Sequence, residues 1–293
     1  MKNKIKAVVL DVDGVIIGNK VGVNTPNPNI EVIEALGELK KRGFIVSFCT
    51  SKPYLGVEKA VRGLNLLNLH ITDGGAVLFD ALSNKAIETF AISSQYAKGL
   101  IQNYIGQGYY VAIYTPTNYM IQKSQKSDIT DKHAFVLQRN PVIVDDLASE
   151  SLKHNIIKIV IIAKNEADKE KPDSMFKTLY AEKLNIKWGQ PQIIKPLQFG
   201  TITDKAISKG KMLLKMMKRC GINRDEVLSV GNSDSDWNFM RETDYVATLE
   251  NGQNGLKTLV NLAGSRGFVS KSVDENGFID ILNHFELISP CYI

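Results

Sequence analysis

Apolar runs alternate with amphipathic segments in the first part of the chain. Residues 5–10 are apolar apart from Lys6 and rich in β-branched side chains, which is typical of a strand buried on both faces. Residues 29–41 have the apolar spacing of an amphipathic helix, and residues 44–49 predict a second buried strand. A helix that begins near Pro53 and a short strand at 70–72 follow. This alternation predicts a parallel sheet with right-handed crossovers.

The middle of the chain has an alternation of its own. Residues 122–133 are polar and charged without a clear period, so we expect a loop there. A helix that begins or kinks at Pro172 is expected within 165–183. The remaining expected elements are a hairpin of 77–80 and 85–90, a helix at 93–107, and strands at 109–114 and 158–163. The pattern indicates a second α/β unit that is inserted in the first.

The strand–helix alternation of the first part of the chain returns after about Gln198. Ser208 is a suitable N-cap for a helix through Arg219, and strands are expected at 226–230 and 245–248. We therefore predict an α/β protein with a Rossmann-like parallel-sheet core and an inserted α/β domain. The core is expected at 1–81 and 198–293, and the insertion at 82–197.

Composition narrows the class of protein. The 293 residues are 44% hydrophobic, enough to bury a core, and the net charge of +5 is spread along the chain. Mild attraction for anionic substrates is expected, but not nucleic-acid binding, which needs clustered basic stripes. Three distant cysteines without a CxxC pair favour neither disulfides nor zinc, so a reducing cytoplasm fits best. No apolar stretch approaches the ~20 residues of a membrane helix, and oligomeric state leaves no signal.

The strongest chemical signal is the sequence Asp11-Val-Asp13-Gly14 at the end of the first predicted strand. Ligands of open α/β sheets bind at the carboxyl ends of strands, which is where these two carboxylates lie. The motif also resembles the start of a calcium loop, but the apolar residues 15–17 provide no further ligands. The simpler alternative is an acidic turn that has no catalytic or metal-binding role.

Three other predicted element ends carry complementary groups. The triplet Thr50-Ser51-Lys52 follows the second strand, and Thr50 can donate a hydrogen bond to a phosphate oxygen. Lys209 stands at the head of a helix, where an ammonium and the helix N-terminus can face one anion. The loop 231–236, Gly-Asn-Ser-Asp-Ser-Asp, supplies oxygen ligands suited to Mg²⁺.

Each of these three signals has an ordinary alternative when taken alone. Thr50 could be only an N-cap, and the loop could be an acidic turn. Lys209 could be a solvated surface lysine, with Lys205 and Lys211 nearby as competitors for the same role.

Taken together and in this order, the four segments resemble the four motifs of the haloacid dehalogenase (HAD) superfamily of phosphohydrolases, over nearly the whole chain. The insertion after the segment 71–80 is placed as in the Cof-type and sucrose-phosphatase-like branch, which carries a large α/β cap of type IIB. Residues 246–251 and 274–277 are similar to the tail of that branch. The Thr-Ser-Lys triplet looks like that of the mannosyl-3-phosphoglycerate phosphatases. The resemblance makes 82–197 a cap that sets substrate specificity.

The resemblance implies a role for each motif residue. Asp11 would be the nucleophile, and Asp13 would protonate the leaving group and then accept a proton from water. Thr50, Ser51 and Lys209 would bind the substrate phosphate. Mg²⁺ would be held by Asp11, by the backbone carbonyl of Asp13, by Asn232 and by Asp236. Asp236 would either reach the metal through water or orient Lys209.

One feature departs from the family pattern. The family usually has Asp where this chain has Asn232, and Asn where it has Ser235. An amide oxygen can still bind Mg²⁺ but adds no formal charge, so weaker metal affinity is expected.

The leading hypothesis is a cytoplasmic Mg²⁺-dependent phosphatase that acts on a small phosphorylated metabolite, such as a sugar phosphate, through an aspartyl phosphate. A phosphomutase is the second hypothesis, because the same intermediate can pass its phosphoryl group to a sugar. The third hypothesis is a binding or regulatory protein whose metal site has decayed. The feature that supports it is Asn232 in place of the usual Asp.

Overall fold

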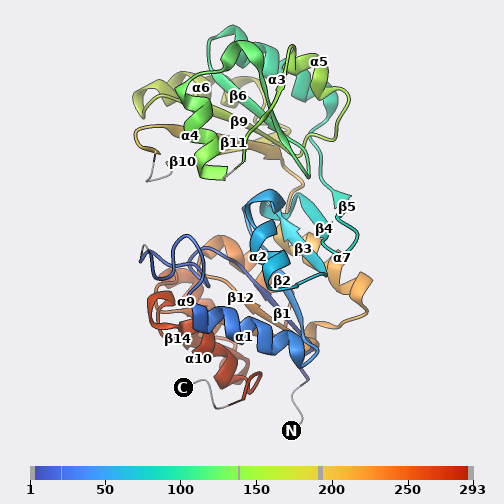
Figure 1. Cartoon of the computed structure of the whole chain (residues 1–293), viewed down its shortest axis with the longest axis vertical. Helices are drawn as coiled ribbons and strands as arrows, with labels where there is room; N and C mark the ends of the chain where they lie inside the picture. Colours follow the sequence, from blue (N-terminus) through green and yellow to red (C-terminus); the bar gives the residue numbers. More distant parts are fainter. Residues whose placement is uncertain (1–3, 21, 138, 191–193, 290–293) are drawn as a thin grey trace. The chain divides into compact units, whose positions relative to one another are not determined.

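The computed structural model describes residues 4–20, 22–137, 139–190 and 194–289. They form two compact units (Figure 1). The first unit consists of the described residues within Met1–Lys52, Val57–Ile87 and Ser208–Ile293, and the second of those within Pro53–Gly56 and Glu88–Ile207. The first unit is therefore built from segments far apart in the sequence.

A five-stranded parallel sheet forms the centre of the first unit. Its order is β14-β13-β12-β1-β2, and every neighbouring pair is parallel. The strands are β1 (Ala7–Leu10), β2 (Ile45–Phe48), β12 (Val227–Val230), β13 (Tyr245–Leu249) and β14 (Gly267–Ser270). β1 and β12 are buried along their whole length, as their apolar sequences predict. The predicted parallel-sheet core is confirmed.

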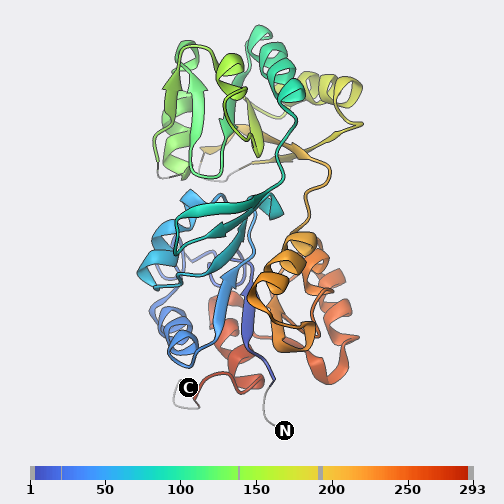
Figure 2. The ribbon, with the colours of Figure 1, turned by 90° about the vertical axis from the view of Figure 1, so that its right-hand side faces the viewer.

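Helices and a small second sheet complete this unit. The helices are α1 (Ile30–Lys41), α2 (Glu58–Gly63), α7 (Lys209–Cys220), α8 (Trp237–Met240), α9 (Asn254–Asn261) and α10 (Gly277–His284). The predicted hairpin is present in a three-stranded sheet of β3 (Leu69–Thr72), β4 (Val77–Asp80) and β5 (Lys85–Thr89), drawn in cyan to teal in Figure 2. A parallel bridge between Cys49 and Ile71 joins the end of β2 to β3.

The helix α7 has clear start and stop signals. The hydroxyl of Ser208 accepts a hydrogen bond from the N–H of Lys211 at 3.1 Å, which confirms the predicted N-cap. Gly221 ends the helix with φ +63°, a left-handed conformation that favours glycine. The side chains that hold the helix against the core are Met212, Leu213, Met216 and Met217. These signals fix Lys209 as the first residue of the helix.

The second unit has a six-stranded mixed sheet with the order β10-β11-β9-β6-β7-β8. The strands are β6 (Tyr110–Tyr114), β7 (Tyr119–Gln122), β8 (Val142–Val144), β9 (Lys158–Ala163), β10 (Leu184–Gly189) and β11 (Gln198–Asp204). Three helices, α3 (Ser94–Gly106), α5 (Leu147–Ser151) and α6 (Glu170–Leu179), contribute side chains to one apolar core with the sheet. Pro172 lies in the first turn of α6, where proline is tolerated.

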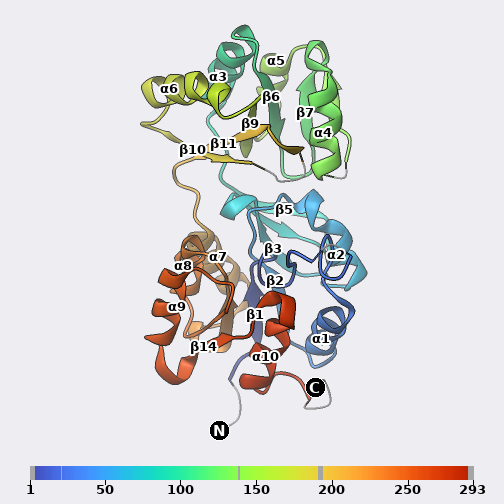
Figure 3. The same ribbon diagram turned by 90° about the vertical axis from the view of Figure 1, so that its left-hand side faces the viewer.

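The prediction of a loop at 122–133 is wrong. A short 3₁₀ turn at Lys123–Gln125 is followed by the helix α4 (Asp128–Leu137), which lies beside β7 in Figure 3. The buried residues of α4 are Thr130 and His133. His133 packs on Tyr119 with ring centroids 5.0 Å apart. The buried face of this helix is polar, so it leaves no apolar period in the sequence.

The helices that the structure describes are short. The longest of them, α3, has 13 residues, and none is long and apolar enough to cross a membrane.

Candidate active site

Strand register brings three of the predicted segments to one edge of the parallel sheet. Leu10 at the end of β1 lies opposite Phe48 of β2 and Val230 of β12. The N–H of Asp11 donates to the carbonyl of Val230 at 2.9 Å, and the N–H of Cys49 donates to the carbonyl of Leu10 at 2.8 Å. The residues that follow these strands therefore leave the sheet together, at the edge where ligands bind in open α/β folds.

The turn after β1 depends on a glycine. Gly14 has φ +78°, and its N–H donates to the carbonyl of Ile17 at 2.7 Å. A Cβ atom at this position would stand 2.1 Å from Nδ2 of Asn232. The side chain of Asn232 therefore lies directly against this turn, as the predicted convergence requires. Asn251 secures the same turn by donating from Nδ2 to the carbonyl of Gly14 at 2.9 Å.

A buried charge cluster lies at the end of β1. The ammonium of Lys209 is 2.7 Å from Oδ1 of Asp236 and 3.5 Å from Oδ2 of Asp11. The side chains of Lys209 and Asp236 are 8% and 1% exposed, and that of Asp11 is 13% exposed. Lys209 is thus distinguished from its sequence competitors Lys205 and Lys211, both of which are exposed.

Burial sets the protonation of this cluster. The pKa of Asp11 is raised from 3.8 to about 6, mainly because burial removes solvent from the carboxylate. The positive charge of Lys209 opposes this shift, and the negative charge of Asp236 adds to it. Burial by itself would lower the pKa of Lys209, but the charges of Asp11 and Asp236 raise it above its ordinary value. The pKa of the buried Cys49 thiol is raised by burial as well. The ammonium is therefore charged at neutral pH, and Asp11 ionises close to neutrality.

The second oxygen of Asp236 organises the loop after β12. Oδ2 accepts hydrogen bonds from the N–H groups of Asn232 and Ser233 at 3.1 and 3.0 Å, and from the Ser233 hydroxyl at 2.8 Å. The hydroxyl of Ser235 lies 2.8 Å from that of Ser233. Both oxygens of Asp236 are thus occupied, one by the loop and one by Lys209. This arrangement favours Asp236 as the group that positions Lys209.

The segment after β2 is held by backbone hydrogen bonds. The N–H of Thr50 donates to the carbonyl of Ile71 at 2.9 Å, and its buried Oγ1 accepts from the N–H of Lys52 at 3.2 Å. Ser51 is exposed. Among the described residues, the hydroxyl proton of Thr50 has no acceptor, so it can be given to a phosphate oxygen. The N–H of Gly74 also donates to the carbonyl of Thr50, at 3.0 Å.

Lys52 is a site residue to which sequence reasoning assigned no role. Its ammonium donates to Oδ1 of Asp13 at 2.7 Å, with side chains 33% and 58% exposed. The motif that contains Lys52 is visible in the sequence. Its contact with Asp13 depends on how two separate turns project from the sheet, which no local pattern shows.

Gly75 lies where the segment after β3 meets the start of α7. A Cβ atom at this position would stand 2.5 Å from the backbone nitrogen of Lys209, and Gly75 has φ +98°. Only glycine allows this close approach, so the segment 71–80, which carries part of the family resemblance, also helps to position Lys209.

The oxygen donors at this edge fit a hard divalent cation. A carboxylate from Asp11, the backbone carbonyl of Asp13 and the amide oxygen of Asn232 are ligands of the kind that Mg²⁺ prefers. In the described part of the chain, no three His, Cys, Asp or Glu side chains are grouped to hold a metal ion. A cation here would therefore rely on neutral donors besides Asp11, as the substitution at position 232 predicts.

Comparison with known proteins identifies the family. The model of the haloacid dehalogenase-like hydrolase family matches residues 8–282, and the chain belongs to this family. The predicted enzyme class, a HAD-type phosphatase, is confirmed. A proposed phosphatase of Streptococcus pyogenes serotype M6 is 22% identical over 286 residues, which cover 93% of this chain and 95% of that protein.

Two solved structures share the fold. A haloacid dehalogenase-like hydrolase from Bacteroides thetaiotaomicron has a TM-score of 0.81 at 16% identity, with 95% of this chain and 98% of that chain covered. The HAD subclass IIB sugar phosphatase BT4131 has a TM-score of 0.71 at 19% identity, with 97% of this chain and 100% of that chain covered. These likenesses confirm the predicted fold, and the family match confirms the predicted HAD resemblance.

Proposed function

We propose that this protein is a Mg²⁺-dependent phosphatase that hydrolyses a small phosphorylated metabolite through a phosphoryl group carried on Asp11. The observation that supports this most directly is the buried Lys209, placed between Asp11 and Asp236 at the carboxyl end of β1. A fixed ammonium beside a carboxylate suits stabilisation of phosphoryl oxygens.

In the first half of the proposed reaction, an ionised oxygen of Asp11 attacks phosphorus. A P–O bond to Asp11 forms while the P–O bond to the leaving alkoxide breaks. Asp13 gives its proton to that alkoxide, so the alcohol leaves neutral. The ammonium of Lys52 contacts Asp13 at 2.7 Å and would orient the carboxylate that this proton transfer leaves on Asp13.

In the second half, water attacks the aspartyl phosphate. Asp13, now a carboxylate, takes a proton from this water, and the bond between Asp11 and phosphorus breaks to release inorganic phosphate. The starting carboxylate of Asp11 and the proton on Asp13 are thereby restored. The same residue acts as acid and then as base.

The phosphate oxygens would be held by the chain's own donors. Lys209 supplies a charge fixed by Asp236, and the hydroxyls of Thr50 and Ser51 supply hydrogen bonds. Mg²⁺ bound by Asp11, the Asp13 carbonyl and Asn232, with Asp236 reaching it only through water, would neutralise phosphate charge and make phosphorus accept a carboxylate nucleophile. Asn232 adds no charge to this set, so we expect millimolar Mg²⁺ to be needed.

A sugar phosphate or similar organic phosphate is the proposed substrate class. The excess of basic residues favours an anionic ligand, and one protein with a related fold is a sugar phosphatase. We propose that the second unit acts as the cap that selects the leaving group, and that the first unit forms the catalytic core. The cytoplasmic location expected from cysteine usage stays a prediction.

The test is phosphate release from a panel of sugar phosphates, phosphoglycerates, nucleotides and an aryl phosphate, with Mg²⁺ and with EDTA. We expect multiple turnovers that need Mg²⁺ and are lost in Asp11→Asn. A phosphomutase would instead form an isomeric sugar phosphate and release little phosphate. Absence of turnover with every ester would favour a binding protein and contradict the proposal.

A further inference from the structure

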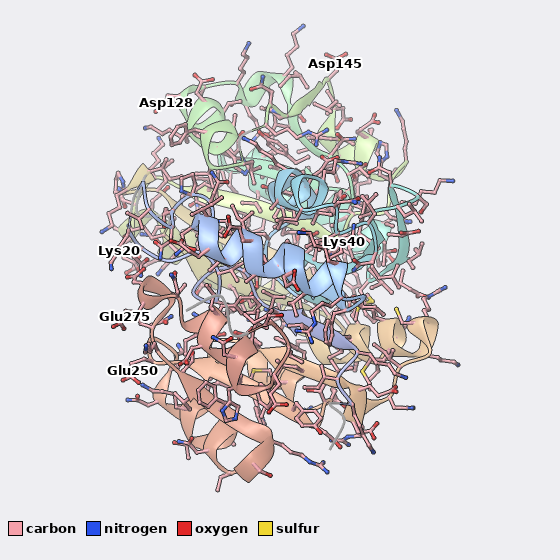
Figure 4. All side chains as sticks on the ribbon, turned by 60° about the horizontal axis from the view of Figure 1, so that its bottom comes forward. Lys20, Lys40, Asp128, Asp145, Glu250 and Glu275 are labelled. Atoms are coloured by element: carbon pink, nitrogen blue, oxygen red, sulfur yellow. The ribbon has the colours of Figure 1, made fainter. Side chains whose placement is uncertain are left out.

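The turn that follows β13 touches both loops that carry the proposed metal ligands. Residues 250–253 join β13 to α9, and Glu250, labelled in Figure 4, marks the start of this turn. The side chain of Asn251 contacts the turn after β1, and that of Gln253 contacts the loop after β12. Both side chains are exposed, so their role lies in these contacts and not in a packed core.

Asn251 uses both ends of its amide on backbone groups. Nδ2 donates to the carbonyl of Gly14 at 2.9 Å, and Oδ1 accepts from the N–H of Val273 at 2.7 Å. One partner needs a donor and the other needs an acceptor, so the orientation of the amide is fixed. Asn251 thereby ties the turn after β1 to the segment that follows β14.

This tie acts on the carbonyl of Asp13, which is a proposed metal ligand. Gly14 has φ +78° and no side chain to restrain it. Its N–H donates to the carbonyl of Ile17 at 2.7 Å, and because the peptide unit is planar and trans, the carbonyl of Asp13 points away from Ile17. The carbonyl of Gly14 itself is held by Asn251. Both peptide units that flank Gly14 are therefore fixed, and the Asp13 carbonyl is fixed with them.

Gln253 holds the loop that contains Asn232, the other proposed neutral ligand. Its backbone N–H donates to the carbonyl of Asn232 at 2.9 Å, and its Oε1 accepts from the N–H of Asp234 at 2.6 Å. The carboxylate of Asp234 lies against the first turn of α9, since a Cβ atom on Gly255 would stand 2.6 Å from its Oδ1. A carboxylate is favourable at a helix N-terminus. The loop after β12 is therefore docked on Gln253 and on the start of α9.

Gly252 keeps these two contacts at a fixed spacing. It is buried, and its N–H donates to the carbonyl of Leu249 at 2.8 Å. A Cβ atom at this position would stand 2.4 Å from Oγ1 of Thr248, so only glycine fits between this turn and the end of β13. The ammonium of Lys257 donates to the carbonyl of Glu250 at 3.1 Å and closes the turn onto α9. The turn is thus a rigid connection between the two ligand loops.

We propose that residues 250–253 form a brace that sets the spacing between the Asp13 carbonyl and the side chain of Asn232, with Asn251 and Gln253 as positioning residues. This inference rests on the proposed Mg²⁺ site. In that site Asp11 supplies the single carboxylate that contacts the metal directly, so affinity depends on neutral donors that are already in place when Mg²⁺ arrives. Loss of a group that orients a metal ligand typically lowers metal affinity roughly 10–100-fold.

The test is calorimetric titration of the full-length chain with MgCl₂. Asn251→Ala should weaken Mg²⁺ binding about tenfold, the lower end of that range, because water can replace part of an exposed hydrogen bond. Gln253→Ala should weaken it less, because the backbone hydrogen bond to Asn232 stays. Both variants should keep nearly the wild-type midpoint in urea unfolding with EDTA. A purely structural role would instead lower that midpoint and leave Mg²⁺ affinity unchanged.

Asn261→Ala is the matched control, because Asn261 is an exposed asparagine at the end of α9, and it should leave Mg²⁺ affinity unchanged. Phosphate release by Asn251→Ala should be reduced at a Mg²⁺ concentration near the wild-type Kd and should recover at saturating Mg²⁺, because the reacting groups are untouched. The brace is overturned if the wild type binds Mg²⁺ and both brace variants bind it equally tightly. Absence of Mg²⁺ binding by the wild type would overturn the proposed metal site together with the brace.

Discussion

Replacing Asp11 by asparagine should stabilise the metal-free protein while it removes the nucleophile. The carboxyl of Asp11 is 13% exposed, and burial raises its pKa from 3.8 to about 6. An ionised Asp11 is therefore less favourable in the folded chain than in the unfolded chain, even with Lys209 nearby. Asparagine resembles the protonated form in size and carries no charge.

The size of this effect follows from proton linkage. A group with a raised pKa contributes full stability below its unfolded pKa and loses that contribution as the pH rises through its folded pKa. For Asp11 the loss runs from about pH 4 to about pH 6 and reaches about 3 kcal/mol, since one pKa unit is about 1.36 kcal/mol. Asp11→Asn avoids the loss, so its advantage should be about 3 kcal/mol near pH 7 and should vanish below about pH 4.

Urea unfolding in EDTA, followed by circular dichroism across this pH range, measures the difference. Asp145→Asn is the matched control, because Asp145 is an exposed carboxylate in the other unit (Figure 4), and it should leave the pH profile unchanged. Added Mg²⁺ should stabilise the wild type more than Asp11→Asn. If Asp11→Asn were less stable than the wild type near pH 7, the assignment of a desolvated nucleophile would be refuted.

Three other substitutions test the site. Lys209→Met leaves Asp236 buried without its ammonium and should lower the free energy of unfolding in urea by about 3–5 kcal/mol. Lys209→Arg should lower it less. A loss under about 1 kcal/mol for Lys209→Met would count against the buried pair. Lys52→Met removes a half-exposed ion pair, so its free energy of unfolding should change by less than about 1 kcal/mol. Its kcat in phosphate-release assays should fall. An unchanged kcat would exclude a role of Lys52 in positioning Asp13. Asn232→Asp adds a charged ligand and should tighten Mg²⁺ binding in calorimetric titration, and unchanged or weaker binding would show that residue 232 is no ligand.

Much of the first unit could be predicted because its elements are marked by strong local signals. Residues 7–10 are apolar and suit a buried strand, so the place of Asp11 at a strand end followed directly. The N-cap at Ser208 and the glycine at 221 bound α7 and thereby fixed Lys209 at its head. Parallel register then brought the strand ends together without further assumptions.

What the sequence could not show depends on packing between distant side chains. The helix α4 buries Thr130 and His133 among aromatic rings, and a polar buried face looks like a loop in the sequence. The pairing of Lys52 with Asp13 joins two turns 39 residues apart. Which of lysines 205, 209 and 211 belongs to the site likewise depends on the position of Asp236, whose Oδ1 is 2.7 Å from the ammonium of Lys209.

Acid quenching of the wild-type protein during turnover of an aryl phosphate with Mg²⁺, followed by mass spectrometry of its peptides, tests the central claim most directly. The account predicts one phosphoryl group on the peptide that contains Asp11, labile to hydroxylamine as an acyl phosphate is, and absent in Asp11→Asn. Steady turnover with no phosphorylated peptide at any quench time, or a phosphoryl group on another residue, would contradict it.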